Sequence, residues 1–235
     1  MAKLSLLDMV QNILTSMDSD DVNSITDTEE SIQIAETVKE SYFRLVSEHD
    51  WPFLKELTNL EGLADTSNPT KMHIPNTVNK IFWVKYNKNQ VEYVPPEDFK
   101  YLIDTRVAQT GVVNSNGYII NAGPSYWTSY DDQYIYFDAI DLTVDTTMQS
   151  SKAVVYTIKV PTWTHSDGFV PDLPEKFFPT LLAEAKATCF LNYKQQANQR
   201  EEANARRGRV RMKNEAIKVD KAEKKYNDKV NYGRK

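Results

Sequence analysis

Apolar residues near the start of the chain recur at helical spacing. Between Ser5 and Met17 they fall on one face of a helix, and the spacing of Ser5 and Asp8 predicts a capping box at its first turn. Residues 18–28 are acidic and polar, which is typical of a loop. We therefore expect a short amphipathic helix followed by an acidic connection.

A second helix is predicted from about Asp27 to His49, because its apolar residues are spaced three and four apart. Thr26 is its expected N-cap, with Glu29 in the capping-box position. The helix should end before Trp51-Pro52-Phe53, since proline disfavours helical backbone in the residue before it.

Between Phe53 and Trp163 the pattern changes to period two and to β-forming residues. Along residues 81–86, odd-numbered and even-numbered side chains are expected on opposite faces of a sheet. Other elements expected in this region are a hairpin turn at residues 87–89, a short helix at residues 95–105, and strands at residues 90–94, 118–121, 134–138 and 153–160.

The longest predicted element is a helix from Glu175 to about Val230, which has no proline after Pro179 and is rich in strong helix formers. About 50 residues at 1.5 Å each make it roughly 75 Å long, whereas a compact chain of this size is roughly 45 Å across. The helix should therefore break near Gly208 or project its second half. A projecting helix with few apolar residues is marginally ordered alone, so another chain would complete it.

Together these elements predict an α+β fold, in which N-terminal and C-terminal helices form a helical bundle. An antiparallel β-sandwich-like domain is inserted between them, and a long C-terminal helix projects. The expected parts are residues 1–52 (N-terminal helical part), 53–170 (β-rich domain), 171–205 (helix completing the bundle) and 206–235 (basic C-terminal arm).

Charge is distributed unevenly along the 235 residues. From Lys194 to Lys235 there are fourteen Lys and Arg against six Asp and Glu, a net charge of +8, and the rest of the chain is at −13. Opposite charges on two parts of one chain favour attraction between copies. They also favour binding of the basic part to an acidic protein or to nucleic acid.

Neither a catalytic nor a metal-binding constellation stands out. The sequence has no phosphate-binding glycine motif, no paired Cys or His at metal spacing and no nucleophile elbow. His49 is expected to support a helix end, and Cys189 to be buried in an apolar stripe. The acidic pairs Asp131-Asp132 and Asp138/Asp141 are interpreted as solvated turns rather than a cation site. We therefore expect a non-enzymatic protein that needs no cofactor and no metal.

Membrane insertion and secretion are not expected. No apolar run approaches the roughly 20 residues that span a bilayer, and the N-terminus lacks the features of a signal peptide. The single cysteine allows no internal disulfide, which suits a reducing compartment.

Two surfaces are candidates for contact with other molecules. Tyr126, Trp127 and Tyr130 could form an aromatic interface, although the favoured interpretation is that alternate aromatic residues of this stretch fill the core of the sheet. Residues 206–211 contain four arginines, and arginine binds carboxylate and phosphate bidentately. This segment could dock in an acidic groove of a protein or contact nucleic-acid phosphates. It lacks interleaved aromatic residues, so sequence-specific DNA binding is not expected.

Three segments and the order of the elements carry a family resemblance. The segments are residues 6–14, the helix from Ala35 that ends in Ser47-Glu-His-Asp-Trp-Pro-Phe53, and Asp172-Leu-Pro-Glu-Lys-Phe-Phe178 before the long helix. In this order of two helices, a β domain and a long charged helix, the chain resembles the head-to-tail adaptor proteins of short-tailed bacteriophages (podoviruses), of the tail tubular protein A type.

The resemblance implies a structural virion protein of the phage neck and tail, assembled in the host cytoplasm. Twelve copies would form a ring, a head-tail connector through whose lumen DNA passes during ejection. The C-terminal segment would bind the portal protein, and the β domain would meet the tail nozzle protein. Carried over to this sequence, the portal-binding residues are Arg206, Arg207, Arg209, Arg211, Lys213, Ile217, Tyr226 and Tyr232.

Two alternatives stay open. A nucleic-acid-binding accessory protein could use the basic C-terminal helix on phosphates, with salt-dependent affinity. A hydrolase using exposed carboxylates is the less favoured alternative, because no acid–base pair with a nucleophile or metal is visible in the sequence.

Overall fold

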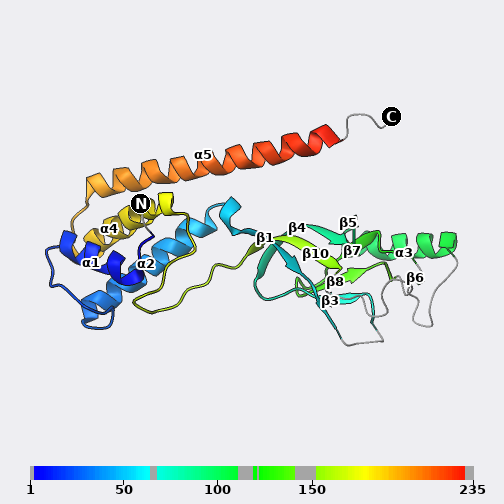
Figure 1. Cartoon of the computed structure of the whole chain (residues 1–235), viewed down its shortest axis with the longest axis horizontal. Helices are drawn as coiled ribbons and strands as arrows, with labels where there is room; N and C mark the ends of the chain where they lie inside the picture. Colours follow the sequence, from blue (N-terminus) through cyan, green and yellow to red (C-terminus); the bar gives the residue numbers. More distant parts are fainter. Residues whose placement is uncertain (1–2, 64–67, 111–118, 121, 141–151, 231–235) are drawn as a thin grey trace. The chain divides into compact units, whose positions relative to one another are not determined.

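The computed structural model describes residues 3–63, 68–110, 119–120, 122–140 and 152–230, and its elements are mixed α and β (Figure 1). The chain divides into two compact units. The first, the helical unit, comprises residues 1–54 and 161–235, and the second, the sheet unit, comprises residues 55–160. Residues 161–170, expected with the β-rich domain, therefore belong with the helices.

The helical unit is built from four α-helices among the described residues. They are α1 (Leu6–Ser16), α2 (Glu29–Ser47), α4 (Phe178–Lys194) and α5 (Gln199–Val230), and short 3-10 helices lie at Pro52–Leu54 and Glu175–Phe177. Helix α1 packs on α2 and α4, α2 packs on α4, and α4 packs on α5. Their shared interior holds large buried side chains, among them Met9, Ile13, Ile34, Tyr42 and Phe178.

Local sequence signals set the ends of the first two helices. The predicted capping box of α1 is confirmed, because Asp8 N donates to Ser5 Oγ and Ser5 N donates to the Asp8 carboxylate. The predicted cap of α2 is wrong by two residues: Thr28 is the N-cap and Ser31 completes its capping box. Asp27 instead accepts hydrogen bonds from backbone amides within the preceding loop, so it stabilises the connection and not the helix.

The single long helix predicted from residue 175 to residue 230 is wrong. Helix α4 ends at Lys194, and Gln195 adopts the left-handed conformation with φ of 51°. Helix α5 then returns alongside α4 (Figure 1). Neither predicted outcome, a break near Gly208 or a projecting second half, describes residues 199–220, because the inner face of α5 packs on the chain's own helices.

Gly208 lies within α5 and faces Thr180 of α4. A Cβ atom added there would stand 2.9 Å from the Cβ of Thr180 and 2.6 Å from its Cγ2. The residue is thus a packing position, since only glycine leaves room for the facing threonine.

The sheet unit contains α3 (Pro96–Thr110) and two sheets. The strands are β1 (Lys55–Asn59), β2 (Glu61–Gly62), β3 (Lys71–His73), β4 (Val78–Tyr86), β5 (Asn89–Tyr93), β6 (Ile119–Ile120), β7 (Tyr126–Thr128), β8 (Tyr134–Phe137), β9 (Ala139–Ile140) and β10 (Ala153–Lys159). The large sheet has eight strands in the order β1-β10-β4-β5-β7-β8-β3-β2, and β6 pairs with β9.

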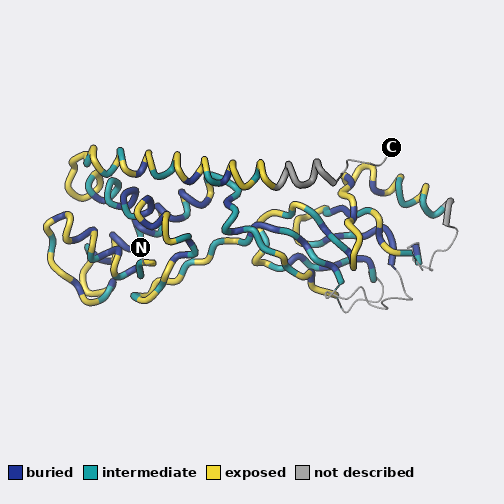
Figure 2. Tube along the Cα trace, turned by 45° about the horizontal axis from the view of Figure 1, so that its top comes forward, coloured by how far each residue is buried: buried dark blue, intermediate teal, exposed yellow. Residues whose placement is uncertain are grey.

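The eight-stranded sheet curls, nearly like a barrel, around one apolar core. Buried residues from both ends of the strand order belong to the same cluster, for example Met72 of β3 and Val155 of β10. The expected purely antiparallel pairing is wrong at two places, since β5 pairs parallel with β7 and β6 pairs parallel with β9. Figure 2 shows the buried positions gathered inside the sheet and between the helices.

A β-bulge in β4 breaks the predicted alternation at Phe82, whereas residues 83–86 alternate between the two faces as predicted. Tyr156 of β10 pairs with Trp83, but the next residue, Thr157, pairs with Ile81, so Phe82 is the extra residue. The rings of Phe82 and Trp83 both contact Tyr156, at centroid distances of 5.5 and 5.3 Å. An extra residue shifts the register by one and brings neighbouring side chains to the same face.

Candidate interaction surface on helix α5

The inner face of α5 is made of small and apolar residues. Ala205, Met212 and Ala216 are at most 4 % exposed, and with Gly208 they follow helical spacing along one side of the helix. Small side chains allow the two helix axes to approach closely. This face joins α5 to the helical unit.

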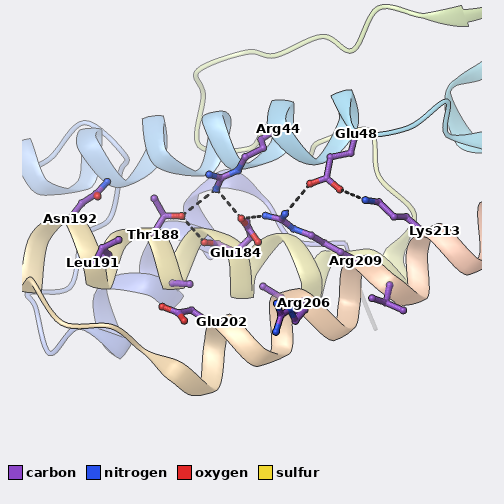
Figure 3. A pocket seen from close by; sticks show the side chains of 13 residues that line it. Arg44, Glu48, Glu184, Thr188, Leu191, Asn192, Glu202, Arg206, Arg209 and Lys213 are labelled. Carbon is purple, nitrogen blue, oxygen red and sulfur yellow. Dashed lines mark hydrogen bonds and ion pairs between the residues drawn. The ribbon is translucent and has the colours of Figure 1, made fainter.

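Ion pairs between α2, α4 and α5 flank that apolar contact (Figure 3). Arg209 of α5 bridges Glu48, at 2.9 Å, and Glu184 of α4. Glu184 also forms an ion pair with Arg44, at an N–O distance of 2.9 Å, and Glu48 forms one with Lys213 at 3.0 Å.

The network places a nearly buried carboxylate between two guanidinium groups. Glu184 is only 8 % exposed, and a carboxylate removed from water is costly unless charged partners surround it. Arg44 and Arg209 supply those partners, so α5 is fixed electrostatically as well as by packing. The positive charges of Arg209 and Lys213, predicted to meet a partner, are thus neutralised by acidic groups of the same chain.

The other three arginines of residues 206–211 lie in a different environment from Arg209. Arg206, Arg207 and Arg211 are exposed, and none makes an ion pair with another residue in the described part of the chain. Two apolar residues of the same helix, Val210 and Ile217, are 54 % and 43 % exposed. The outer surface of α5 therefore combines free cations with exposed aliphatic groups. The side chain of Tyr226 and the whole of Tyr232 lie outside the described residues.

Two grooves run along the α4–α5 contact, one on each flank. The first groove lies beside α2 and has a volume of about 730 Å³ (Figure 3). Its wall contains Arg44, Glu48 and Glu184, and its exposed apolar lining residues are Leu191 and Val210.

The second, which we name the cationic groove, is about 570 Å³ and has no α2 residue in its wall. Its charged lining residues are Lys176, Lys186, Arg207 and Arg211 against the single acid Glu201. Lys176 is paired with Glu215. Burial lowers the pKa of Lys186, an effect that nearby Glu201 opposes. An anion entering this groove would meet three cations that lack an ion-pair partner in the described structure.

No protein-family model matches this chain, and no curated protein matches it.

The three aromatic residues proposed as an interface have different environments. Trp127 is 7 % exposed and belongs to the core cluster of the sheet unit, so for this residue the core interpretation is right. Tyr126 is half-buried. Tyr130 is 59 % exposed and packs edge-on against Tyr136 at 4.8 Å, so its interface role stays a prediction.

Asp138 is not the solvated turn residue that was predicted. It is 1 % exposed, forms an ion pair with Arg106, and accepts hydrogen bonds of 2.9 Å from the backbone amides of Ser125 and Tyr126. It therefore ties α3 to β7. Asp141 lies outside the described residues.

The predicted supporting roles of Cys189 and His49 agree with their environments. Cys189 is fully buried, and burial raises the pKa of its thiol to about 12. The His49 ring packs edge-on against Trp51 at 5.2 Å, with Nε2 3.7 Å from a carboxylate oxygen of Asp220.

Among the described residues, no group of three or more His, Cys, Asp and Glu side chains is placed to hold a metal ion. No helix in that part of the chain has the length and apolarity to cross a membrane.

Sequence reasoning missed an aromatic surface on the sheet unit. Phe82, Trp83 and Tyr156 form a contiguous group, with the ammonium of Lys55 5.3 Å from the Phe82 ring and that of Lys85 4.7 Å from the Trp83 ring. Leu57, opposite Tyr156 on β1, is 64 % exposed. The adjacent Phe-Trp pair was the available signal, but strict alternation assigned its members to opposite faces.

Proposed function

We propose that this protein is a structural head-to-tail adaptor of a short-tailed phage virion, acting as a ring that joins the portal to the tail and passes DNA through its lumen. The observation that supports it most is the outer surface of α5, where Arg206, Arg207 and Arg211 are exposed without ion-pair partners in the described residues. Such a surface adds nothing to the stability of its own fold, whereas arginine binds acidic groups of another subunit well.

The internal ion-pair network gives the proposal its physical basis. Because Arg209 and Lys213 hold α5 on the helical unit, the free arginines are presented on an ordered helix and not on a disordered arm. Preorganisation lowers the entropy lost on binding. The role proposed is mechanical docking between preformed surfaces, with no chemical step.

In the proposed ring, the helices act as a bundle that forms the wall, and α5 meets acidic surfaces of the portal protein and of neighbouring copies. The sheet unit, interpreted as an inserted sandwich-like domain, meets the tail nozzle protein. Twelve copies, DNA in the lumen and a virion location follow from the family resemblance and form part of the proposal.

Electron microscopy of the purified chain, alone and mixed with the portal protein of the same virion, tests this function. We expect rings on the portal, and we expect R206E/R207E/R211E to lose portal binding while far-ultraviolet circular dichroism stays unchanged. The matched control K3E/K88E/K194E reverses three exposed charges outside α5 and should bind normally. A wild-type chain that neither forms rings nor binds the portal would refute the proposal.

The nucleic-acid alternative is favoured by the same three arginines and is separated by salt dependence. Filter binding to duplex DNA over a salt series should give a logarithmic slope of about −3 if three arginines contact phosphates. The accessory-protein function would be favoured if the wild-type chain gave a slope of that size and did not bind the portal, and if R206E/R207E/R211E lost the slope.

A further inference from the structure

The cationic groove needs an anionic occupant. Lys186, Arg207 and Arg211 stand in its wall without an ion-pair partner among the described residues, and only Glu201 opposes them in charge. Partial burial of Lys186 lowers its pKa and so disfavours the charged ammonium form. An anion bound nearby would stabilise that charged form. Charge complementarity therefore selects an acidic segment over an apolar one.

The chain itself carries a suitable acidic segment between α1 and α2. We name residues 18–28 the acidic loop. Asp18, Asp20 and Asp21 are exposed, as is Glu29 at the start of α2, and in the described structure no cation pairs with them. Three carboxylates within four residues match the three free cations of the groove in number and in sign.

The acidic loop is held in one shape by its own contacts. Val22 and Ile25 are each 3 % exposed and anchor it to the helical unit. The amide of Ile25 donates to Asp167 Oδ1 at 2.8 Å, and Gln11 Nε2 donates to the Val22 carbonyl at 2.8 Å. Since the loop is already ordered, docking it costs little conformational entropy.

In both views α5 runs along the top of the helical unit, whereas the acidic loop curves round its left end and lower edge (Figures 1 and 2). Among the described residues, no hydrogen bond or ion pair joins the loop to the groove of its own copy. A contact between two different patches of the same chain is heterologous, and such contacts close into rings when the rotation between copies allows.

We propose that the acidic loop of one copy docks in the cationic groove of the next copy. This inference rests on the proposed ring and names the contact between its subunits. Arg207 and Arg211 then make the contact with a neighbouring copy that the proposed ring assigns to part of α5, whereas Arg206 lines the other groove.

Mixing two charge-reversed variants provides the test. D20K/D21K carries a basic loop and a native groove, whereas R207E/R211E carries a native loop and an acidic groove. Sedimentation velocity at low salt should show wild-type self-association, weakened about tenfold or more in either variant alone. A one-to-one mixture of the two should recover it, because each loop then meets a groove of opposite charge.

Matched controls separate this contact from a general charge effect. E40K/E92K and K218E/K221E reverse exposed charges outside the loop and the groove, and both should associate like wild type. Raising the ionic strength should weaken wild-type association, since exposed charges are screened by salt.

The outcomes distinguish this contact from the proposed function. Rings on the portal that persist in D20K/D21K, variants that fail to rescue each other, or a wild-type chain that stays monomeric at low salt would each overturn the loop–groove contact. Mutual rescue of the variants in a protein that never binds the portal would support the contact and refute the adaptor function.

Discussion

Substitution of Gly208 by alanine tests whether α5 packs on α4 in solution. In an exposed helix, glycine to alanine stabilises by about 1 kcal/mol. Here the new methyl group would lie 2.9 Å from the Cβ of Thr180 and 2.6 Å from its Cγ2. A β-branched side chain has little rotamer freedom with which to move away. Overpacking of this kind costs about 1–3 kcal/mol.

The two effects oppose each other, and the overpacking is the larger. We expect G208A to lower the free energy of unfolding by about 1 kcal/mol, measured by urea unfolding followed by far-ultraviolet circular dichroism. In the T180A background the loss should shrink, because the Cγ2 and Oγ1 atoms that crowd the new methyl group are gone. N214A, at an exposed position of the same helix, should instead stabilise by roughly 0.5 kcal/mol.

The sign of the effect decides between two pictures of α5. If G208A stabilised the protein by about 1 kcal/mol, as N214A is expected to do on a smaller scale, residue 208 would be facing water. The helix would then project from the body, and the packing argued from Gly208 and Thr180 would be refuted.

Three further predictions follow from buried polar groups. R209M should destabilise the protein by about 1–2 kcal/mol, because Glu48 and Glu184 lose a shared partner, whereas R207M at an exposed site should change the unfolding free energy by less than about 0.5 kcal/mol. D138N should cost about 2–3 kcal/mol of thermal or urea stability, since it removes the charge opposite Arg106; an unchanged midpoint would contradict the burial argument. Burial raises the pKa of Cys189 to about 12 from 9.0, so the unfolded state loses this proton first and stability should fall as pH rises from about 9 to 12. C189A should flatten that decline, and native Cys189 should resist iodoacetamide at pH 8 until the protein is unfolded.

Much of the local structure was predictable from neighbouring residues. The first helix, its Ser5–Asp8 capping box and the strand that ends at Tyr86 all follow from short-range spacing. The cap of the second helix was misplaced because several Ser, Thr and Asp residues precede it, and each is a competent cap. Which of them is used depends on how Asp27 is engaged by the loop.

The candidate site was only partly predictable. The density of arginines at residues 206–211 singled out the right helix. Sequence spacing could not show which of these arginines form internal ion pairs, because Arg209 pairs with Glu48 and Glu184 only after distant segments of the chain come together. The acidic loop was predicted as a loop, but its position relative to α5 depends on the packing of the helices.

The amino-acid sequence alone indicates where most helices and strands form, because helix caps, hairpin turns and hydrophobic period act between residues close along the chain. It also fixed the opposite charges of the two parts of the chain. Only the folded chain shows that the last helix turns back at Gln195, that Gly208 packs against Thr180, and that the bulge at Phe82 brings two aromatic rings to one face. These outcomes depend on contacts between distant segments, which local spacing does not specify.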